Sequence, residues 1–386
     1  MDFQLTEEQA ELQEAARKFA RAETVELARE LEATNTPVPI EMRRRYGEMG
    51  FLGVNLPEAH GGMGLGHLEA LLVLEQFAMV SVAVAFPIFE ALTGPVRTIQ
   101  HFASDALKAK IIPEVVKGET VVAVSMSEPD AGTALTDLKT TARIEGEEIV
   151  ISGQKRWTSG AGHSDVYIVY CRLSDAPGAK GIGAVLVEKD RDGMSFGSQE
   201  ELMGFRGIPS ADIFLDEVRV PKDNMIVPAG GFAKLMQAFS LERCGNATMS
   251  LGLAAAALEE ATAYAQEREQ FGKPIVDFQA IQLKLASMAM KVEASRLLIY
   301  RAAVNASQGL PNIFESSVGK CFANEMVREV TADGMQIMGG YGYSKEYGME
   351  QRVRDGFAWG IAGGTTDVQK TNIAAALIGR RFNQRR

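Results

Sequence analysis

The chain has few of the residues from which metal and disulfide sites are built. Its 386 residues include three cysteines and four histidines. The cysteines are widely spaced, which gives no disulfide or zinc framework and favours a reducing compartment. The histidines lack metal-ligand spacing, and we interpret them as surface or hydrogen-bonded residues. We expect no metal site from Cys171, Cys244, Cys321, His60, His67, His101 and His163.

Positive charge and long apolar runs are also scarce. The net charge of −10 and the pI near 5.2 argue against a nucleic-acid footprint, which needs a basic face. The longest apolar stretch, Phe77 to Phe89, contains Pro87 and is shorter than the roughly 20 residues of a membrane helix. Met1 to Gln4 leads straight into an acidic segment without a signal peptide. We expect a cytoplasmic protein of two or three domains, with no membrane insertion.

The first third of the chain has helical periodicity. Thr6 to Gln9 has the form of a capping box, and apolar residues from Leu12 to Phe19 recur on one helical face. Proline and glycine break the pattern before further helical segments. These segments lie at about 40–49, 68–79 and 104–116.

From about Val121 the apolar period changes to two, which predicts a β domain ending near Pro221. We expect strands at 140–144, 149–153, 166–171, 182–188 and 213–220. The final third returns to long helical periods, typical of a four-helix bundle. We expect those helices at about 231–267, 276–306, 313–338 and 366–382. The predicted domains are 1–117, 118–228 and 229–386 of an α+β multidomain protein.

Two stretches of the middle domain have the residue types of a ligand site. The loop from Ser127 to Thr133 contains Gly132, which lets backbone approach a ligand closely, and hydroxyls that suit an oxygen-rich ligand. The segment from Gly153 to Ser159 places an aromatic plane, Trp157, beside small hydroxyls, which suits a flat heteroaromatic ring. Alone, the loop is more typical of a plain turn between strands, and the second stretch is what favours a ligand site.

Here the chain resembles the acyl-CoA dehydrogenase family of flavoproteins, over essentially its whole length. The family loop reads roughly TEPGAGSD and the hairpin roughly NGxKxWITNG. The chain retains Glu128-Pro129, Ala131-Gly132 and Trp157, with conservative exchanges at Ser127, Thr133 and Ser159. It departs from the loop pattern at Asp130 and Ala134. The resemblance implies an N-terminal helical domain, a middle β barrel and a C-terminal four-helix bundle.

Three further stretches carry the resemblance: Glu267 to Gly272, Gln336 to Gly342 and Gly363 to Asp367. In relatives the first two reach the FAD of a neighbouring subunit, and the third precedes a helix whose N-terminus can hold an anion. Their structural alternatives are a helix-end arginine, a flexible helix end and an N-cap. The implied FAD-binding residues are Met126, Ser127, Gly132, Thr133, Trp157, Thr158, Ser159, Arg268, Phe271, Gln336, Gly339, Gly340, Thr365 and Asp367.

The reaction implied is α,β-dehydrogenation of an acyl-CoA thioester. A carboxylate removes the α-proton, the β-hydrogen leaves as hydride to flavin N5, and hydrogen bonds to the thioester carbonyl stabilise the developing charge. Many relatives carry this glutamate at the position of Gly363. A second branch, which includes isovaleryl-CoA and long-chain dehydrogenases, places it beside an arginine on the first bundle helix. Glu242-Arg243 fits that branch, so we expect Glu242 to be the base.

The substrate-binding residues implied are Arg243, Thr133 and Glu90. Glu90 lies in an apolar run, where a carboxylate needs a partner or a role; a helix-end charge is the alternative. The resemblance also implies an electron-transfer flavoprotein as partner, and a homotetramer built as a dimer of dimers. The alternatives are an enoyl-CoA reductase, a non-catalytic FAD-sharing subunit of a heteromeric complex, and a flavin oxidase or oxygenase.

Overall fold

The first third of the chain is helical in a computed structural model, which describes residues 3–306 and 309–382. The predicted capping box is confirmed, since Thr6 accepts a hydrogen bond from the Gln9 backbone and the Gln9 side chain accepts one from Thr6. Three of these helices, α2, α5 and α6, are additional to the segments predicted from periodicity; α6 begins at Pro95, a favoured first helical residue. The helices are α1 (Glu7–Glu23), α2 (Val25–Thr34), α3 (Ile40–Glu48), α4 (His67–Val80), α5 (Val82–Leu92), α6 (Pro95–Phe102) and α7 (Asp105–Val116).

The middle third forms one eight-stranded sheet with the order β6-β7-β3-β2-β4-β5-β8, while β1 pairs parallel to β4. The strands are β1 (Val122–Ser125), β2 (Thr141–Glu145), β3 (Glu148–Ser159), β4 (Val166–Arg172), β5 (Ile182–Glu188), β6 (Met194–Phe196), β7 (Ser210–Pro221) and β8 (Met225–Val227). β3 is longer than predicted and carries Trp157 within its pairing to β7.

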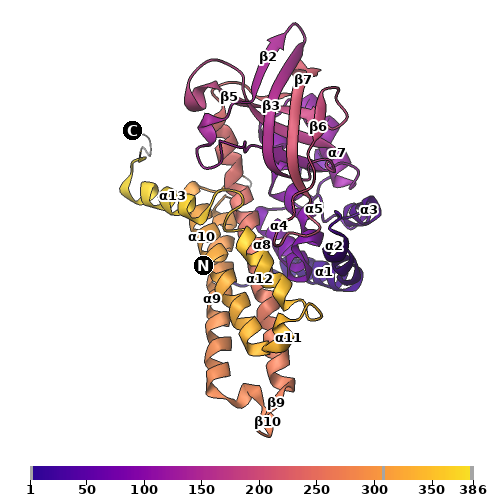
Figure 1. Cartoon of the computed structure of the whole chain (residues 1–386). Coiled ribbons are helices and arrows are strands. Elements are labelled where there is room, and N and C mark those ends of the chain that lie inside the picture. Colours follow the sequence, from indigo (N-terminus) through magenta and orange to yellow (C-terminus); the bar gives the residue numbers. More distant parts are fainter. Residues whose placement is uncertain (1–2, 307–308, 383–386) are drawn as a thin grey trace.

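The final third is a helical bundle built around α8 (Phe232–Glu267), α9 (Gln279–Ala306), α10 (Ile313–Met338) and α13 (Thr366–Ile378). α13 ends earlier than predicted because Gly379 takes the left-handed conformation that terminates helices. The short helices α11 (Gly340–Tyr343) and α12 (Met349–Ala358) were not predicted. Figure 1 shows the bundle extending away from the sheet, with the small ribbon β9 (Glu269–Gln270) and β10 (Lys273–Pro274) at its far end.

One apolar core joins the N-terminal helices, one face of the sheet and the bundle. The opposite face of the sheet packs around a separate core. The span Val82–Phe102 is long and apolar enough to cross a membrane by composition, but 89% of it is buried within the protein. α5, which lies in this span, packs against α8. The N-terminal domain therefore contacts the first long helix of the bundle.

Candidate active site

The Ser127–Thr133 loop is held in place by a buried ion pair. The Glu128 carboxylate accepts hydrogen bonds from the backbone of Lys139 and Thr140 and from Lys155 Nζ at 2.8 Å. Lys155 is fully buried and also donates to the Met126 carbonyl. Burial alone raises the pKa of Glu128, but the charge of Lys155 and these hydrogen bonds outweigh it and lower that pKa. The glutamate of the motif therefore shapes the loop.

The rest of this loop faces outward. Gly132 is exposed, and a Cβ placed on it meets nothing within 4 Å, so its backbone is open to a ligand. Thr133 is exposed beside it. Asp130, one of the departures from the family pattern, forms a surface ion pair with Lys139 at 2.9 Å. The exposed backbone and hydroxyl fit the predicted ligand contact at this loop.

At the end of β3 lies the predicted stacking ring. Trp157 is 54% exposed, although it sits inside the paired region of the sheet. Thr158 is buried, and its hydroxyl donates to Ser125 at 3.4 Å. Ser159 shares a 3.5 Å contact with Ser210. The exposed ring and the Ser127–Thr133 loop come together because the Arg156 N–H donates to the Ser127 carbonyl.

Two acids from different domains meet where α5 crosses α8. The helices approach closely at Gly245, where an added Cβ would overlap Thr93 and contact Phe89. Glu90 follows Phe89 on α5, and Glu242 lies one turn before Gly245 on α8. Neither carboxylate makes a hydrogen bond or salt bridge within the described residues, although Glu90 is only 6% exposed. Glu90 does lie in the last turn of α5, as the helix-end alternative has it, but its side chain is buried.

These surroundings raise the pKa of both acids, for partly different reasons. Burial raises the pKa of Glu242 to about 8, while the charges of Arg243 and Lys320 oppose that rise. Burial and then the negative charge of Glu242 raise the pKa of Glu90 well above its usual range. Paired carboxylates in one apolar site cannot both ionise readily. Of the two, Glu242 is the one that releases its proton first.

Gly363 lies opposite Glu242, with φ of +62°. A Cβ placed there points toward Asn246 and Phe239, at 3.4 and 3.7 Å. These residues are one turn after and one turn before Glu242 on α8. A side chain at 363 would thus point toward the face of α8 that carries Glu242.

A buried lysine that the sequence did not single out holds this glycine loop. Lys320 Nζ donates to the carbonyls of Trp359, Ala362 and Gly364 at 3.4, 2.8 and 2.6 Å. Burial lowers the pKa of Lys320 to about 7, but three carbonyl acceptors match the three N–H bonds of an ammonium. A lysine within an apolar helix gives no sequence signal, because its carbonyl partners come from a loop about 40 residues later.

Arg243 is buried against the same region. Its Nη1 donates to the Ser240 hydroxyl at 3.1 Å, and its guanidinium lies 5.5 Å from the centre of the Phe239 ring. Its Nε has no hydrogen-bond partner among the described residues. A buried cation with a spare donor suits a polar group of a substrate.

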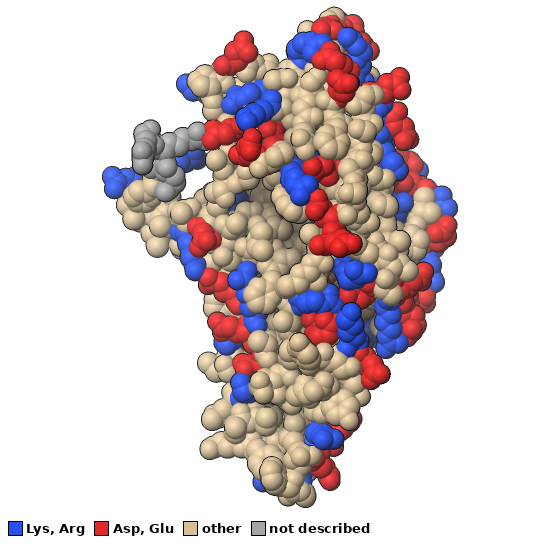
Figure 2. All heavy atoms as spheres, in the orientation of Figure 1, with Lys and Arg blue, Asp and Glu red and all other residues tan. Residues whose placement is uncertain are grey.

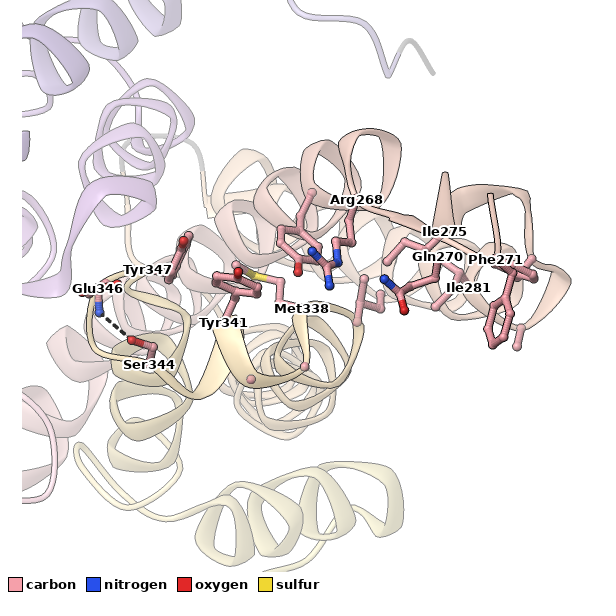
Figure 3. A pocket seen from close by; sticks show the side chains of 16 residues that line it. Arg268, Gln270, Phe271, Ile275, Ile281, Met338, Tyr341, Ser344, Glu346 and Tyr347 are labelled. Atoms are coloured by element: carbon pink, nitrogen blue, oxygen red, sulfur yellow. Dashed lines mark hydrogen bonds between the residues drawn. The ribbon is translucent and has the colours of Figure 1, made fainter. Parts of the chain in front are cut away.

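A second set of predicted residues lines an open groove of about 810 Å³ at the far end of α8 (Figure 3). Arg268 points across it, with its guanidinium 5.7 Å from the centre of the Tyr341 ring. An added Cβ at Gly339 or Gly340 would meet nothing within 4 Å, so backbone is exposed there. Phe271 is 94% exposed. Gln336 does not line this groove in the described structure.

The third predicted stretch begins α13. Thr365 is the N-cap, and its hydroxyl accepts from the Val368 N–H at 3.3 Å. The structural alternative therefore holds for Thr365, whereas Asp367 is exposed in the first turn.

These parts of the predicted cofactor site are not adjacent within one chain. Arg268 follows Glu242 by 26 residues, which at about 1.5 Å per residue of helix separates them by roughly 39 Å. The start of α8 packs against β5 and β8, and its end packs against β10. In Figure 1 the tip of the sheet and the β9–β10 ribbon lie at opposite ends of the molecule.

Comparison with known families decides the identity of this arrangement. Three family models match in succession: the acyl-CoA dehydrogenase N-terminal domain over residues 6–119, the middle domain over 123–218, and the C-terminal domain over 229–378. The chain belongs to the acyl-CoA dehydrogenase family. The predicted helical, sheet and helical architecture is confirmed by these matches.

Relatives of this chain within the family are named for several activities. The chain is 35% identical to a 3-sulfinopropanoyl-CoA desulfinase of Paraburkholderia xenovorans, covering 100% of this chain and 99% of that one. It is 35% identical to a 3-(aryl)acrylate reductase of Clostridium sporogenes, covering 97% and 99%. A glutaryl-coenzyme A dehydrogenase in complex with glutaryl-CoA superposes with a TM-score of 0.95 at 35% identity, covering 100% and 99%.

As a member of the acyl-CoA dehydrogenase family, the protein is a flavin-dependent oxidoreductase whose cofactor is FAD. The residues present fit that cofactor. The exposed Trp157 ring suits a flavin, Gly132 leaves backbone open beside it, and the Gly339-Gly340 backbone with Arg268 suits a pyrophosphate or nucleotide.

Proposed function

We propose that the protein catalyses the FAD-dependent α,β-dehydrogenation of an acyl-CoA thioester, with Glu242 as the base. The observation that carries this proposal is the Glu242 carboxylate, which lacks a hydrogen bond or salt bridge among the described residues. Glu242 is partly buried on the face of α8 that Gly363 approaches, and at the position of Gly363 the other branch of the family has its glutamate. A base for an acidic C–H bond must be shielded from water and free to accept a proton.

In this proposal each acid of the pair has its own role. Glu242, ionised, accepts the α-proton at a carboxylate oxygen. Glu90, kept protonated by burial and by its neighbour, lines the acyl pocket and can donate a hydrogen bond to a polar acyl group. Arg243 positions the substrate through its spare N–H, and Thr133 contacts the CoA. FAD, when bound, supplies the hydride acceptor for the β-hydrogen.

An enoyl-CoA reductase is the second candidate. The similarity to a 3-(aryl)acrylate reductase over 97% of the chain favours it, and the same pair of acids can return a proton to the α-carbon. We propose electron-transfer flavoprotein as the redox partner and the cytoplasm as the location, in keeping with three buried free cysteines among the described residues.

The proposed base sets the pH dependence of catalysis. Because burial raises the pKa of Glu242 to about 8 and the base must be deprotonated, kcat/KM of the free enzyme should rise with pH and level off above about 8. Lys320→Met removes a cation that lowers this pKa, so the rise should move to higher pH. Lys370→Met, which changes an exposed lysine on α13, is the matched control. A profile that is flat between pH 6 and 9, or unaffected by Lys320→Met, would contradict this assignment.

We propose further that one FAD is shared between two subunits of a homotetramer. The roughly 39 Å along α8 between Glu242 and Arg268 supports a second copy, because Arg268 is too far from the proposed base of its own chain to share one cofactor site with it. α9 also exposes an apolar residue at every seventh position, the spacing of a helix-packing seam. These residues are Leu283, Met290, Leu297 and Val304. Figure 2 shows few charged side chains over the end of the bundle.

Light scattering on the FAD-bound protein should therefore give the mass of a tetramer. Met290→Lys places a charge in the α9 seam, at a side chain already 73% exposed, and should lower both the mass and the FAD content. Ile144→Lys, at an exposed residue of the β2–β3 hairpin, should change neither. A monomer that holds FAD at full occupancy would refute the shared site.

A further inference from the structure

Trp157 is held in a backbone conformation that bulky residues rarely adopt. Its φ is +60°, in the left-handed region, where a side chain other than glycine is strained. The strain coincides with a bulge between β3 and β7: Lys155 pairs with Ile213 and Thr158 with Ala211, so two residues, Arg156 and Trp157, oppose one. Bulges re-aim side chains, and such strain persists only where neighbouring contacts impose it.

The contacts that impose it centre on Arg156. Its guanidinium lies 4.1 Å from the centre of the Trp157 ring, a close cation–π contact. The same group pairs with Asp212 at 2.8 Å and Glu200 at 2.7 Å. Asp212 is the residue opposite the bulge, and its other oxygen accepts from Gln154 at 2.9 Å. Both carboxylates contact the same nitrogen, Nη1, and so hold the guanidinium while it covers one face of the indole.

We propose that Arg156 is a positioning residue for the flavin. Locked by Asp212 and Glu200, it clamps one face of Trp157 and holds the ring so that its other face is presented, already ordered, to the isoalloxazine ring. When the ring is ordered before FAD binds, the entropy cost of ordering it is not part of the binding free energy. The inference rests on the proposed contact between Trp157 and FAD; it concerns affinity and ring order, not the base.

The order of the ring can be measured without FAD. Trp157 and Trp359 are the two tryptophans of the chain, and Trp359 is buried, so a Trp359→Phe background leaves Trp157 as the single fluorophore. In the apoprotein, Arg156→Met and Asp212→Asn should lower fluorescence anisotropy and raise acrylamide quenching about twofold. Arg156→Lys, which retains a cation over the ring, should lie between them and the parent. Arg143→Met, at an exposed arginine in ion pairs on β2, is the matched control.

FAD is then titrated into the same apoproteins to measure its dissociation constant. We expect the dissociation constant to rise about tenfold in Arg156→Met and Asp212→Asn, to recover partly in Arg156→Lys, and to remain unchanged in Arg143→Met. Unchanged quenching in Arg156→Met would overturn the clamp. Weaker FAD binding without altered quenching would also overturn it, because it would indicate a direct Arg156 contact. Absence of turnover in a protein that binds FAD and orders Trp157 as expected would count against the proposed reaction and not against the clamp. The two failures are therefore distinguishable.

Discussion

Glu242→Gln lowers turnover by about 10²–10⁴-fold, the range over which a positioned general base contributes, and leaves FAD bound. Glutamine retains the size of the side chain but cannot accept the α-proton. The proposed FAD contacts lie on the Ser127–Thr133 loop, on β3 and at the end of α8, so cofactor content should not change. The measurement is turnover with an active acyl-CoA beside the flavin-to-protein absorbance ratio.

The matched control for this substitution is Glu259→Gln. Glu259 lies on the same helix, half-exposed in an ion pair with Arg21, and its change should leave turnover nearly intact. Undiminished turnover in Glu242→Gln would move the base elsewhere. Glu90→Gln is then the next variant, because Glu90 is the other carboxyl at the α5–α8 crossing.

Lys155→Met lowers the stability of the middle domain by about 3–5 kcal/mol, the cost of leaving one partner of a buried ion pair uncompensated. Glu128 would remain buried against two backbone N–H groups with no cation beside it. The melting temperature should fall by at least roughly 4 °C, from the unfolding entropy per residue applied to the whole chain. The loop from Ser127 to Thr133 should also loosen, so FAD should bind more weakly.

The control is Lys139→Met, which removes the cation of the exposed pair with Asp130 and should hardly change the melting temperature. Glu128→Gln with Lys155→Met, which removes both charges, should recover part of the lost stability. If Lys155→Met melts as the parent does, the ion pair does not hold the loop.

Much of the architecture could be predicted from local pattern. The capping box at Thr6 and the long periods of α8 and α10 mark their helices, and those helices form. The helix α11 was missed because its four residues are too few for periodicity to show, whereas α12 was missed although it is as long as the predicted α3. The length of β3 was missed because two register shifts, between Ile151 and Gly153 and between Lys155 and Thr158, interrupt the alternation on which strand prediction depends.

The candidate site also has residues that local sequence pattern predicts and residues that it does not. Local motifs gave Trp157, Gly132 and the Gly339-Gly340 backbone, and the exchange of Gly363 for Glu242 needed only a comparison with the family pattern. Partners distant in sequence could not be predicted. Asp212 meets Arg156 only through the β3–β7 register, and Lys320 meets its carbonyls only through the packing of α10 against the loop before α13.

The most direct test is an anaerobic titration of the FAD-bound protein with saturated acyl-CoAs, followed by the long-wavelength absorbance of the flavin. The set should include straight-chain, branched, alicyclic, aromatic and sterol-derived acyl groups. We predict bleaching of the parent by at least one of them and no bleaching of Glu242→Gln by that same thioester. If every saturated thioester leaves the flavin oxidised while an enoyl-CoA reoxidises the chemically reduced enzyme, the protein is a reductase and the proposed direction is wrong.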